Sequence, residues 1–365
     1  MDADLRKLAK QLSEILQDYA VAPVTCDTVV EWIQQFDSED RVPILNELVH
    51  VLRKTYISRE RAKNTLSTFL DQMIAQSYGG DARRFAAETS FLSIQEPDES
   101  QCDLLKLADE ILQERHNLTI TAFGQGKVRR FIYLDDGIFT GNKLRYDLVA
   151  PPNDRASGKR GWLSDQAPNG SILHIFVLIA HSAGLAYADR HIKEAANQRD
   201  VRVRFHHCLL VKNARKQGVH QHECLWPSSH YDNQRLRRYI EELCAEISEG
   251  TGGRMILRPA DTPRREQFFS SAEARERLEK AFVLRGLELM EGTSIPSLRP
   301  LGFEKLISLG FGTLAIPYRN CPNNAPLVLW WRSGGWKPLL QRRDHVQEQC
   351  RSLEGTEGDP ESIPW

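Results

Sequence analysis

Apolar residues in the first 80 positions recur every three or four residues, which is the period of an amphipathic α-helix. The first such stripe joins Leu5, Leu8, Leu12, Ile15, Leu16 and Tyr19. Three further stripes follow over residues 29–36, 44–52 and 66–73. Thr25 or Asp27 is a candidate N-cap for the second helix, and Ser58 precedes the fourth. The pattern predicts a helical N-terminal domain over residues 1–80 whose apolar stripes pack on one another.

The period of the pattern changes after about residue 88. Short apolar or alternating runs predict strands at residues 91–94, 119–123, 131–134, 172–180 and 201–205. Helical stripes predict helices at residues 101–115, 185–196, 235–247 and 272–289. Strands that alternate with helices favour an α/β fold, in which a parallel sheet is covered by helices on both faces.

This predicted α/β domain covers residues 85–343, and its C-terminal part mixes short strands with turns. Residues 151–170 are rich in Pro, Asn, Asp, Gly and Ser, which predicts a surface loop. Residues 344–365 are a charged tail.

Residues 129–143, RRFIYLDDGIFTGNK, combine an apolar strand with two acids and a glycine turn. At a strand end, the adjacent carboxylates of Asp135 and Asp136 need hydroxyl donors or a cation, and a ribose diol with Mg²⁺ supplies both. Thr140, Gly141 and Asn142 then offer a hydroxyl and backbone N–H groups that suit a phosphate. Together the two features predict a site for a ribose 5-phosphate.

The same segment resembles the phosphoribosyl-pyrophosphate motif of type I phosphoribosyltransferases. The resemblance implies that Asp135 and Asp136 are the catalytic acids, which hold the ribose hydroxyls and the Mg²⁺-loaded substrate. It also implies that Gly137 and the turn over residues 140–142 bind the ribose phosphate. Lys143 departs from the family pattern, in which a small hydroxyl residue is usual.

Those transferases carry a small, basic pyrophosphate loop after their first strand, and the matching segment here is acidic. Residues 95–100 read QEPDES, with three acids directly before a predicted helix. Such a segment repels pyrophosphate unless Mg²⁺ bridges the charges. We expect Ser100 or Asp98 to be a helix cap.

Elements along most of the chain resemble the phosphoribosyltransferase-like proteins of bacterial conflict systems. They are WIQQF among the N-terminal helices, LDDGIFTGN in the middle, and LGFGTLAIP, CPNNAPLVLWW and WKPLLQRR near the end. This resemblance implies a role in anti-phage defence beside protein partners of the same operon, such as nucleases, ATPases or reverse transcriptases.

Three other groups of residues carry two interpretations each. His181 and Ser182 close a predicted buried strand and are candidates for base binding, or His181 is structural. Four histidines and two cysteines within residues 206–224 either bind zinc or pack and face solvent. Residues 201–240 carry eight Lys and Arg against two acids, which suits a nucleic acid or a solvated face.

The overall composition and charge narrow the choice among these interpretations. The formal net charge is −1, so any nucleic-acid contact must be local. Seven cysteines are scattered without a CxxC pair, which favours a reducing environment. No apolar run approaches the roughly 20 residues that span a bilayer. We therefore expect a cytoplasmic protein without a membrane contact.

The sequence leaves three functions open. The first is an enzyme that uses Mg²⁺ to transfer a ribose-phosphate unit between pyrophosphate and a nitrogenous acceptor. The second is a non-catalytic nucleotide-sensing or scaffold subunit, which the acidic segment at residues 95–100 favours. The third is a nucleic-acid-associated component that uses the basic residues of 201–240.

Overall fold

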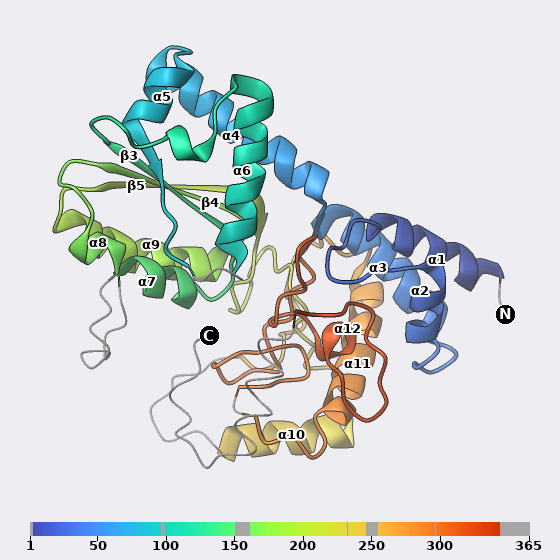
Figure 1. Cartoon of the computed structure of the whole chain (residues 1–365). Coiled ribbons are helices and arrows are strands. Elements are labelled where there is room, and N and C mark those ends of the chain that lie inside the picture. The colour runs from blue at the N-terminus through green and yellow to red at the C-terminus, as the bar shows by residue number, and fades with distance from the viewer. Residues whose placement is uncertain are drawn as a thin grey trace. The chain divides into compact units, whose positions relative to one another are not determined.

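The structure is a computed structural model of the chain (Figure 1). It describes residues 3–95, 99–149, 161–231, 233–245, 255–295 and 297–343. The charged tail at 344–365 and the first half of the predicted loop at 151–170 (residues 151–160) therefore lie outside the described residues. Among the described helices, none is long and apolar enough to cross a membrane.

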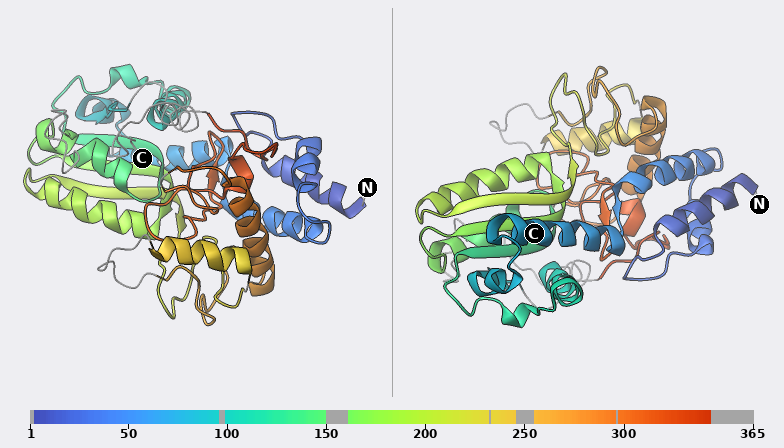
Figure 2. Two further views of the ribbon diagram at one scale, coloured as in Figure 1. Left: turned by 90° about the horizontal axis from the view of Figure 1, so that it is seen from below. Right: turned by 90° about the horizontal axis from the view of Figure 1, so that it is seen from above.

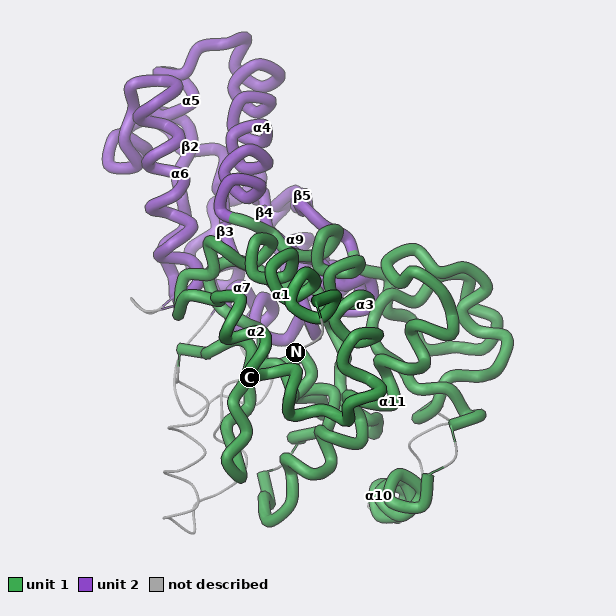
Figure 3. The backbone as a smooth tube through the Cα atoms, turned by 90° about the vertical axis from the view of Figure 1, so that its right-hand side faces the viewer, with its two compact units in different colours: residues 1–58, 211–363 green, residues 59–210, 364–365 purple. Residues whose placement is uncertain are grey.

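The described chain divides into two compact units (Figure 3). Unit 1 contains the described residues up to Ser58 and those from Val211 onward. Unit 2 is the continuous stretch 59–210. The divisions thus fall at residues 58 and 210, whereas the sequence pattern placed a boundary near residue 80.

Unit 1 combines the first three predicted helices with the C-terminal part of the chain. Its elements are α1 (Ala3–Ile15), α2 (Cys26–Ile33), α3 (Arg41–Thr55), β1 (Tyr56–Ile57), α10 (Gln234–Ala245), α11 (Ala272–Leu289), β6 (Ile316–Pro317) and α12 (Leu327–Trp330). The predicted cap of the second helix is confirmed, since the Thr28 N–H donates to Thr25 Oγ1 at 3.1 Å. Strands β1 and β6 pair in parallel and join the two distant parts of the chain.

Unit 2 contains the fourth predicted helix and the alternating strands and helices. Its elements are α4 (Arg59–Tyr78), α5 (Ala82–Glu88), β2 (Thr89–Phe91), α6 (Ser100–His116), η1 (Ile120–Ala122), β3 (Arg130–Ile138), α7 (Asn142–Val149), α8 (Trp162–Asp165), β4 (Ile172–His181), α9 (Ser182–Asn197) and β5 (Arg202–Val211). The predicted α/β fold is confirmed: a parallel sheet is flanked by helices.

The sheet has the order β2-β3-β4-β5, with β2, β3 and β4 parallel. Ile132 faces His174 and Leu134 faces Phe176 in the register of the two central strands. One face carries the core formed with α7, α8 and α9, which includes Tyr133, Leu144, Leu148, Leu163, Ile175 and Ile192. On the other face Phe69 of α4 packs on Phe176, with ring centroids 5.2 Å apart. Figures 1 and 2 show the sheet of unit 2 between α4 on one side and α7, α8 and α9 on the other.

One predicted strand is wrong. Residues 119–123 contain the 3₁₀ turn η1 instead, because the Ile120 N–H donates to Asp109 Oδ1 at 2.6 Å and the Ala122 N–H to the Thr119 carbonyl. The alternation of Thr and apolar residues resembles a strand, but these two bonds use its backbone donors locally. The predicted run 91–94 is shifted, since β2 covers Thr89–Phe91.

Candidate functional site

The two adjacent acids of the central motif lie near the carboxyl end of β3. This strand lies between β2 and β4, so Asp135 and Asp136 are at a central position of the sheet. The chain then turns through Thr140 and Gly141 and begins α7 at Asn142. Loops at the carboxyl ends of parallel strands are where α/β sheets bind ligands, and the first N–H groups of a helix suit a phosphate.

Two glycines allow this turn to pack against the first turn of α9. Gly141 has φ +85°, a conformation that L side chains rarely adopt, and a Cβ there would lie 2.5 Å from the Gly184 carbonyl oxygen. A Cβ on Gly184 would lie 1.8 Å from the Phe139 carbonyl oxygen. The backbone of the turn is therefore held by direct contact with α9, which orients the N–H groups at the start of α7.

The Asp135 carboxylate is buried and has four donor groups within hydrogen-bond distance, two of which it shares with a second carboxylate. Ser100 Oγ and the Asp136 N–H donate to Oδ1, the latter at 2.8 Å. Gln95 Nε2 and Tyr133 OH lie 3.2 and 3.0 Å from Oδ2. Only 2% of Asp135 is exposed, whereas Asp136 is partly exposed. The two adjacent acids therefore have different surroundings.

A second carboxylate, Asp147 of α7, joins the same network. Its Oδ2 lies 2.7 Å from Tyr133 OH and 3.0 Å from Gln95 Nε2. Burial raises the pKa of Asp147 above its ordinary value, while Lys143 opposes this shift. Lys143 Nζ bonds Glu99 Oε1 at 2.7 Å. The sequence pattern does not single out Asp147 or Tyr133, although Tyr133 lies two positions before Asp135 and so shares its face of the strand.

Burial alone would lower the pKa of Lys143, but the carboxylates of Asp147, Asp135 and Glu99 hold it above its ordinary value. Lys143 therefore stays charged beside the turn. A cation at the start of α7 adds to the attraction that the helix N-terminus exerts on a phosphate.

Ser100 has a different role from the predicted one. Glu99 is the N-cap of α6 without a side-chain capping bond, Ser100 is the first helical residue, and its hydroxyl binds Asp135. The alternative cap, Asp98, lies outside the described residues.

His181 is completely buried at the end of β4, and its ring centroid lies 5.1 Å from that of Phe139. Burial lowers its pKa to about 3, so the ring is neutral at physiological pH. Ser182 begins α9 and is partly exposed. The pair lies beside the turn, and His181 supports it from within the core, which favours the structural interpretation of this histidine.

The His and Cys residues of 206–224 are divided between the two units. Residues 206–208 lie on β5 in unit 2, whereas residues 220–224 belong to unit 1. His206 Nε2 lies 3.2 Å from His174 Nδ1, and His222 Nδ1 lies 3.1 Å from a backbone carbonyl. In the described part of the chain, no group of three or more His, Cys, Asp or Glu residues is arranged to hold a metal ion.

The basic residues of 201–240 are likewise divided between the units, and several are paired. Arg215 Nη1 lies 2.8 Å from Glu304 Oε2, and Arg235 Nη1 lies 3.3 Å from Glu288 Oε1. Arg237 and Arg238 on α10 are exposed. The exposed Lys and Arg residues of this segment in unit 1 are therefore Lys212, Lys216, Arg237 and Arg238, and two of these four lie on α10.

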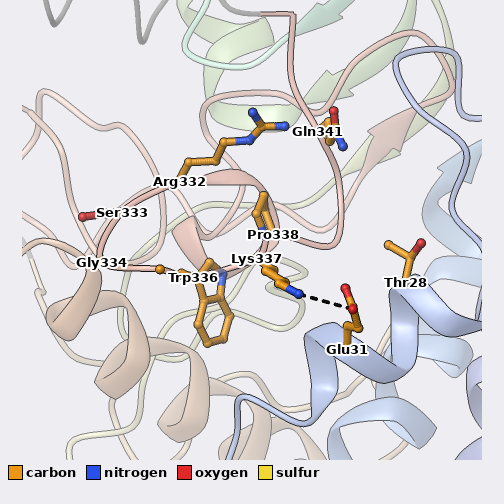
Figure 4. A pocket seen from close by; sticks show the side chains of 10 residues that line it. Thr28, Glu31, Arg332, Ser333, Gly334, Trp336, Lys337, Pro338 and Gln341 are labelled. Carbon is orange, nitrogen blue, oxygen red and sulfur yellow. Dashed lines mark hydrogen bonds and ion pairs between the residues drawn. The ribbon is translucent and has the colours of Figure 1, made fainter.

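Unit 1 also contains an open hollow of about 580 Å³ (Figure 4). Its lining residues come from α2 and the segment after α12: Thr28, Glu31, Arg332, Ser333, Gly334, Gly335, Trp336, Lys337, Pro338 and Gln341. Across it, Lys337 Nζ pairs with Glu31 Oε1 at 3.2 Å. None of the residues of the ribose-phosphate motif lines this hollow.

The donor set around β3 fits a Mg²⁺ ion that is held mainly by its ligand. Mg²⁺ in phosphate sites is bound by one or two carboxylates together with water and substrate phosphates. Asp136 offers a partly exposed carboxylate for this purpose, whereas the oxygens of Asp135 already accept protein hydrogen bonds.

Comparison with known protein families identifies the family to which most of the chain is similar. The profile of the PRTase-CE family, which comprises phosphoribosyltransferase-like domains associated with conflict systems, matches residues 29–342. No curated protein and no solved structure matches the chain. The matched range covers most of the chain and includes the whole segment from β3 to α7. The chain therefore belongs to the PRTase-CE family of phosphoribosyltransferase-like proteins.

Proposed function

We propose that the segment from Asp135 to Asn142 binds a ribose 5-phosphate compound together with Mg²⁺, with phosphoribosyl pyrophosphate or a nucleotide as the ligand. The observation that carries the proposal is the sequence of features at one sheet edge: two acids, a glycine turn and a helix N-terminus. The acids suit the ribose hydroxyls and the metal, and the N–H groups of residues 140–142 suit the phosphate. Membership of a phosphoribosyltransferase-like family supports it.

In an enzyme, the bound Mg²⁺ would neutralise phosphate charge. The chain's own residues would hold the ribose and its phosphate in a fixed orientation, which can supply much of the catalysis when the leaving group departs. The turn at 139–141 is held by α9, so its donors need little rearrangement when the ligand binds.

Calorimetry tests this proposal on the full chain. We expect phosphoribosyl pyrophosphate and ribose 5-phosphate to bind in the presence of Mg²⁺, and ribose without a phosphate to bind at least about tenfold more weakly. Thr140→Val, which removes one exposed hydroxyl from the turn, should weaken ribose 5-phosphate binding several-fold. A chain that binds neither phosphorylated sugar would contradict the proposal.

One observation favours a second function, a nucleotide-sensing or scaffold subunit without turnover. Ser100 and Gln95 bind Asp135, so one of the two acids expected to hold the ribose is already engaged. Glu99 also places an acid on Lys143 beside the turn. An assay for pyrophosphate release from Mg²⁺-phosphoribosyl pyrophosphate, in the presence of a nitrogenous acceptor, distinguishes an enzyme from a sensor. A sensor would bind the ligand without consuming it.

We further propose that the protein acts in anti-phage defence in a complex with operon partners, and that the exposed arginines of α10 contact a partner protein or a nucleic acid. The association of the family with conflict systems supports the first part. Arg237→Glu with Arg238→Glu should weaken phage protection and co-purification of the partner. Lys10→Glu on α1 serves as the control for charge reversal at an exposed site. Full protection in the double variant would refute the α10 contact.

A further inference from the structure

The two acids at the end of β3 differ in how much of each is available to a ligand. Successive side chains of a strand point to opposite faces, so Asp135 and Asp136 project in different directions. Asp135 is 2% exposed and Asp136 is partly exposed. A ligand outside the strand end thus meets Asp136 more readily than Asp135.

The hydrogen-bonding capacity of Asp135 is already used within unit 2. A carboxylate has about four lone-pair positions, and four donor groups lie within hydrogen-bond distance of Asp135: Ser100 Oγ and the Asp136 N–H on Oδ1, and Gln95 Nε2 and Tyr133 OH on Oδ2. Tyr133 has a single O–H proton, so it alternates between Asp135 and Asp147. A ribose hydroxyl that approached Asp135 would compete with these buried donor groups, and a displaced buried donor would lose its acceptor without gaining water.

The donors come from different elements, which gives the buried carboxylate a structural task. Gln95 follows β2, and Ser100 is the first residue of α6. Tyr133 and Gln95 also bond Asp147 on α7, at 2.7 and 3.0 Å. Through these bonds Asp135 connects β3 with the start of α6 and with the helix that follows the phosphate turn.

We propose that the adjacent acids have separate roles: Asp136 contacts the ribose hydroxyls, and Asp135 is a positioning residue that holds the first turn of α6 and the helix α7 in place. The contact assigned to Asp136 rests on the proposed function. The anchoring assigned to Asp135 rests only on its burial and on the four donor groups that surround it.

The matched variants are Asp135→Asn and Asp136→Asn, made singly in the full chain. An amide at position 135 turns one acceptor into a donor that faces other donors, so the melting temperature should fall by roughly 5 °C or more. At the partly exposed position 136 the shift should stay within about 2 °C. Hydrogen exchange in the first turn of α6 and in α7 should rise for Asp135→Asn alone.

Binding then separates a ligand contact from positioning. The probes are ribose 5-phosphate and 2-deoxyribose 5-phosphate with Mg²⁺, because a carboxylate that contacts the sugar hydroxyls distinguishes the two. Asp136→Asn should bring the ratio of their affinities close to one. Asp135→Asn should weaken both ligands and keep the wild-type ratio.

The proposal is overturned if Asp135→Asn removes the preference for ribose while its melting temperature stays unchanged. If Asp135→Asn fails to fold, Ser100→Ala removes one of the four donors and should lower the melting temperature by a few degrees, with faster exchange in α6 and an unchanged ratio. If the wild type binds neither sugar phosphate, the proposed function fails, and melting temperature and exchange still decide the anchoring role.

Discussion

At the scale of single residues, Gly184 decides whether the phosphate turn can form. A Cβ at this position would lie 1.8 Å from the Phe139 carbonyl oxygen and 2.7 Å from its carbonyl carbon. These are backbone atoms, so neither can move without shifting the turn or α9. The glycine is needed for the close approach of two backbones, and its φ is not positive.

We therefore expect Gly184→Ala to lower the free energy of unfolding by about 3 kcal/mol, as overpacking in a tight core does, and to weaken ribose 5-phosphate binding at least tenfold. Thermal denaturation and calorimetry measure the two effects. Ala186→Ser, at an exposed position of the same helix, is the control and should change neither. Normal stability in Gly184→Ala would mean that the turn and α9 do not meet as described.

A buried histidine pair gives unit 2 a dependence on pH. His174 is 3% exposed, and its Nδ1 lies 3.2 Å from His206 Nε2 beside the ring of Phe69 on α4. Burial, followed by the neighbouring His206, lowers the pKa of His174 to about 3, and burial followed by Arg204 lowers that of His206 to about 4. The folded protein therefore favours neutral rings.

In the unfolded chain these rings take up protons near pH 6.5. Their contribution to stability is therefore complete above about pH 6.5 and is lost as the pH falls toward the folded values. At pH 5 the loss from His174 should be about 2 kcal/mol. Between pH 7 and pH 5, the free energy of unfolding should therefore fall further in the wild type than in His174→Phe, and the difference between the two falls should be about 2 kcal/mol. His181 and His222, whose pKa values are also lowered by burial, remain in both proteins. Equal slopes would contradict the assignment.

At the scale of elements, the sequence pattern predicts those helices and strands whose formation depends on residues close together in the sequence. The structure has β3 and β4 where the apolar runs predict strands, and α9 and α11 where the helical stripes predict helices. The pattern fails at residues 119–123, where the side chain of Asp109 takes a backbone donor from a strand-like segment. It also could not reveal Gln95 or Asp147, because their bonds to Tyr133 join residues far apart in sequence.

The buried face of α11 carries a charge network that no motif indicated. Arg275 is 0% exposed and donates to Glu279 at 2.7 Å, to Glu266, and to the carbonyls of His222 and Cys224. Since Glu279 is also buried, removal of the guanidinium leaves a carboxylate and two carbonyls with fewer donors. The loss of one partner of a buried pair typically costs about 3–5 kcal/mol.

Arg275→Met should accordingly destabilise unit 1 by about 3 kcal/mol, the low end of that range, because Arg258 Nη2 still lies 3.0 Å from Glu279. Urea denaturation measures the change. Arg277→Met, on the same helix, removes a more exposed pair with Asp40 and should cost less than about 1 kcal/mol. If the two variants lose similar amounts of unfolding free energy, the buried network stabilises unit 1 no more than the exposed ion pair does.

At the scale of the whole molecule, the two units differ in how the chain forms them. Unit 2 is one continuous stretch, whereas unit 1 is assembled from segments before and after it. The sheet of unit 2 and the core that it forms with α7, α8 and α9 lie within residues 59–210. The ribose-phosphate segment therefore belongs to a part of the chain that has its own core.

Helix α4 decides where this foldable part begins. Its buried residues include the large apolar side chains of Leu66, Phe69, Leu70, Met73 and Ile74, which together contribute on the order of 10 kcal/mol at about 2 kcal/mol each. A typical domain is stable by only about 5–15 kcal/mol.

A fragment of residues 59–211 should thus unfold cooperatively and bind ribose 5-phosphate with Mg²⁺ within about tenfold of the full chain. A fragment of residues 85–211, which lacks α4, should remain unfolded because the Phe176 face of the sheet is then uncovered. Circular dichroism and calorimetry on both fragments test this. Cooperative unfolding of the shorter fragment would place the start of the domain after α4, at the boundary near residue 80 that the sequence pattern indicates.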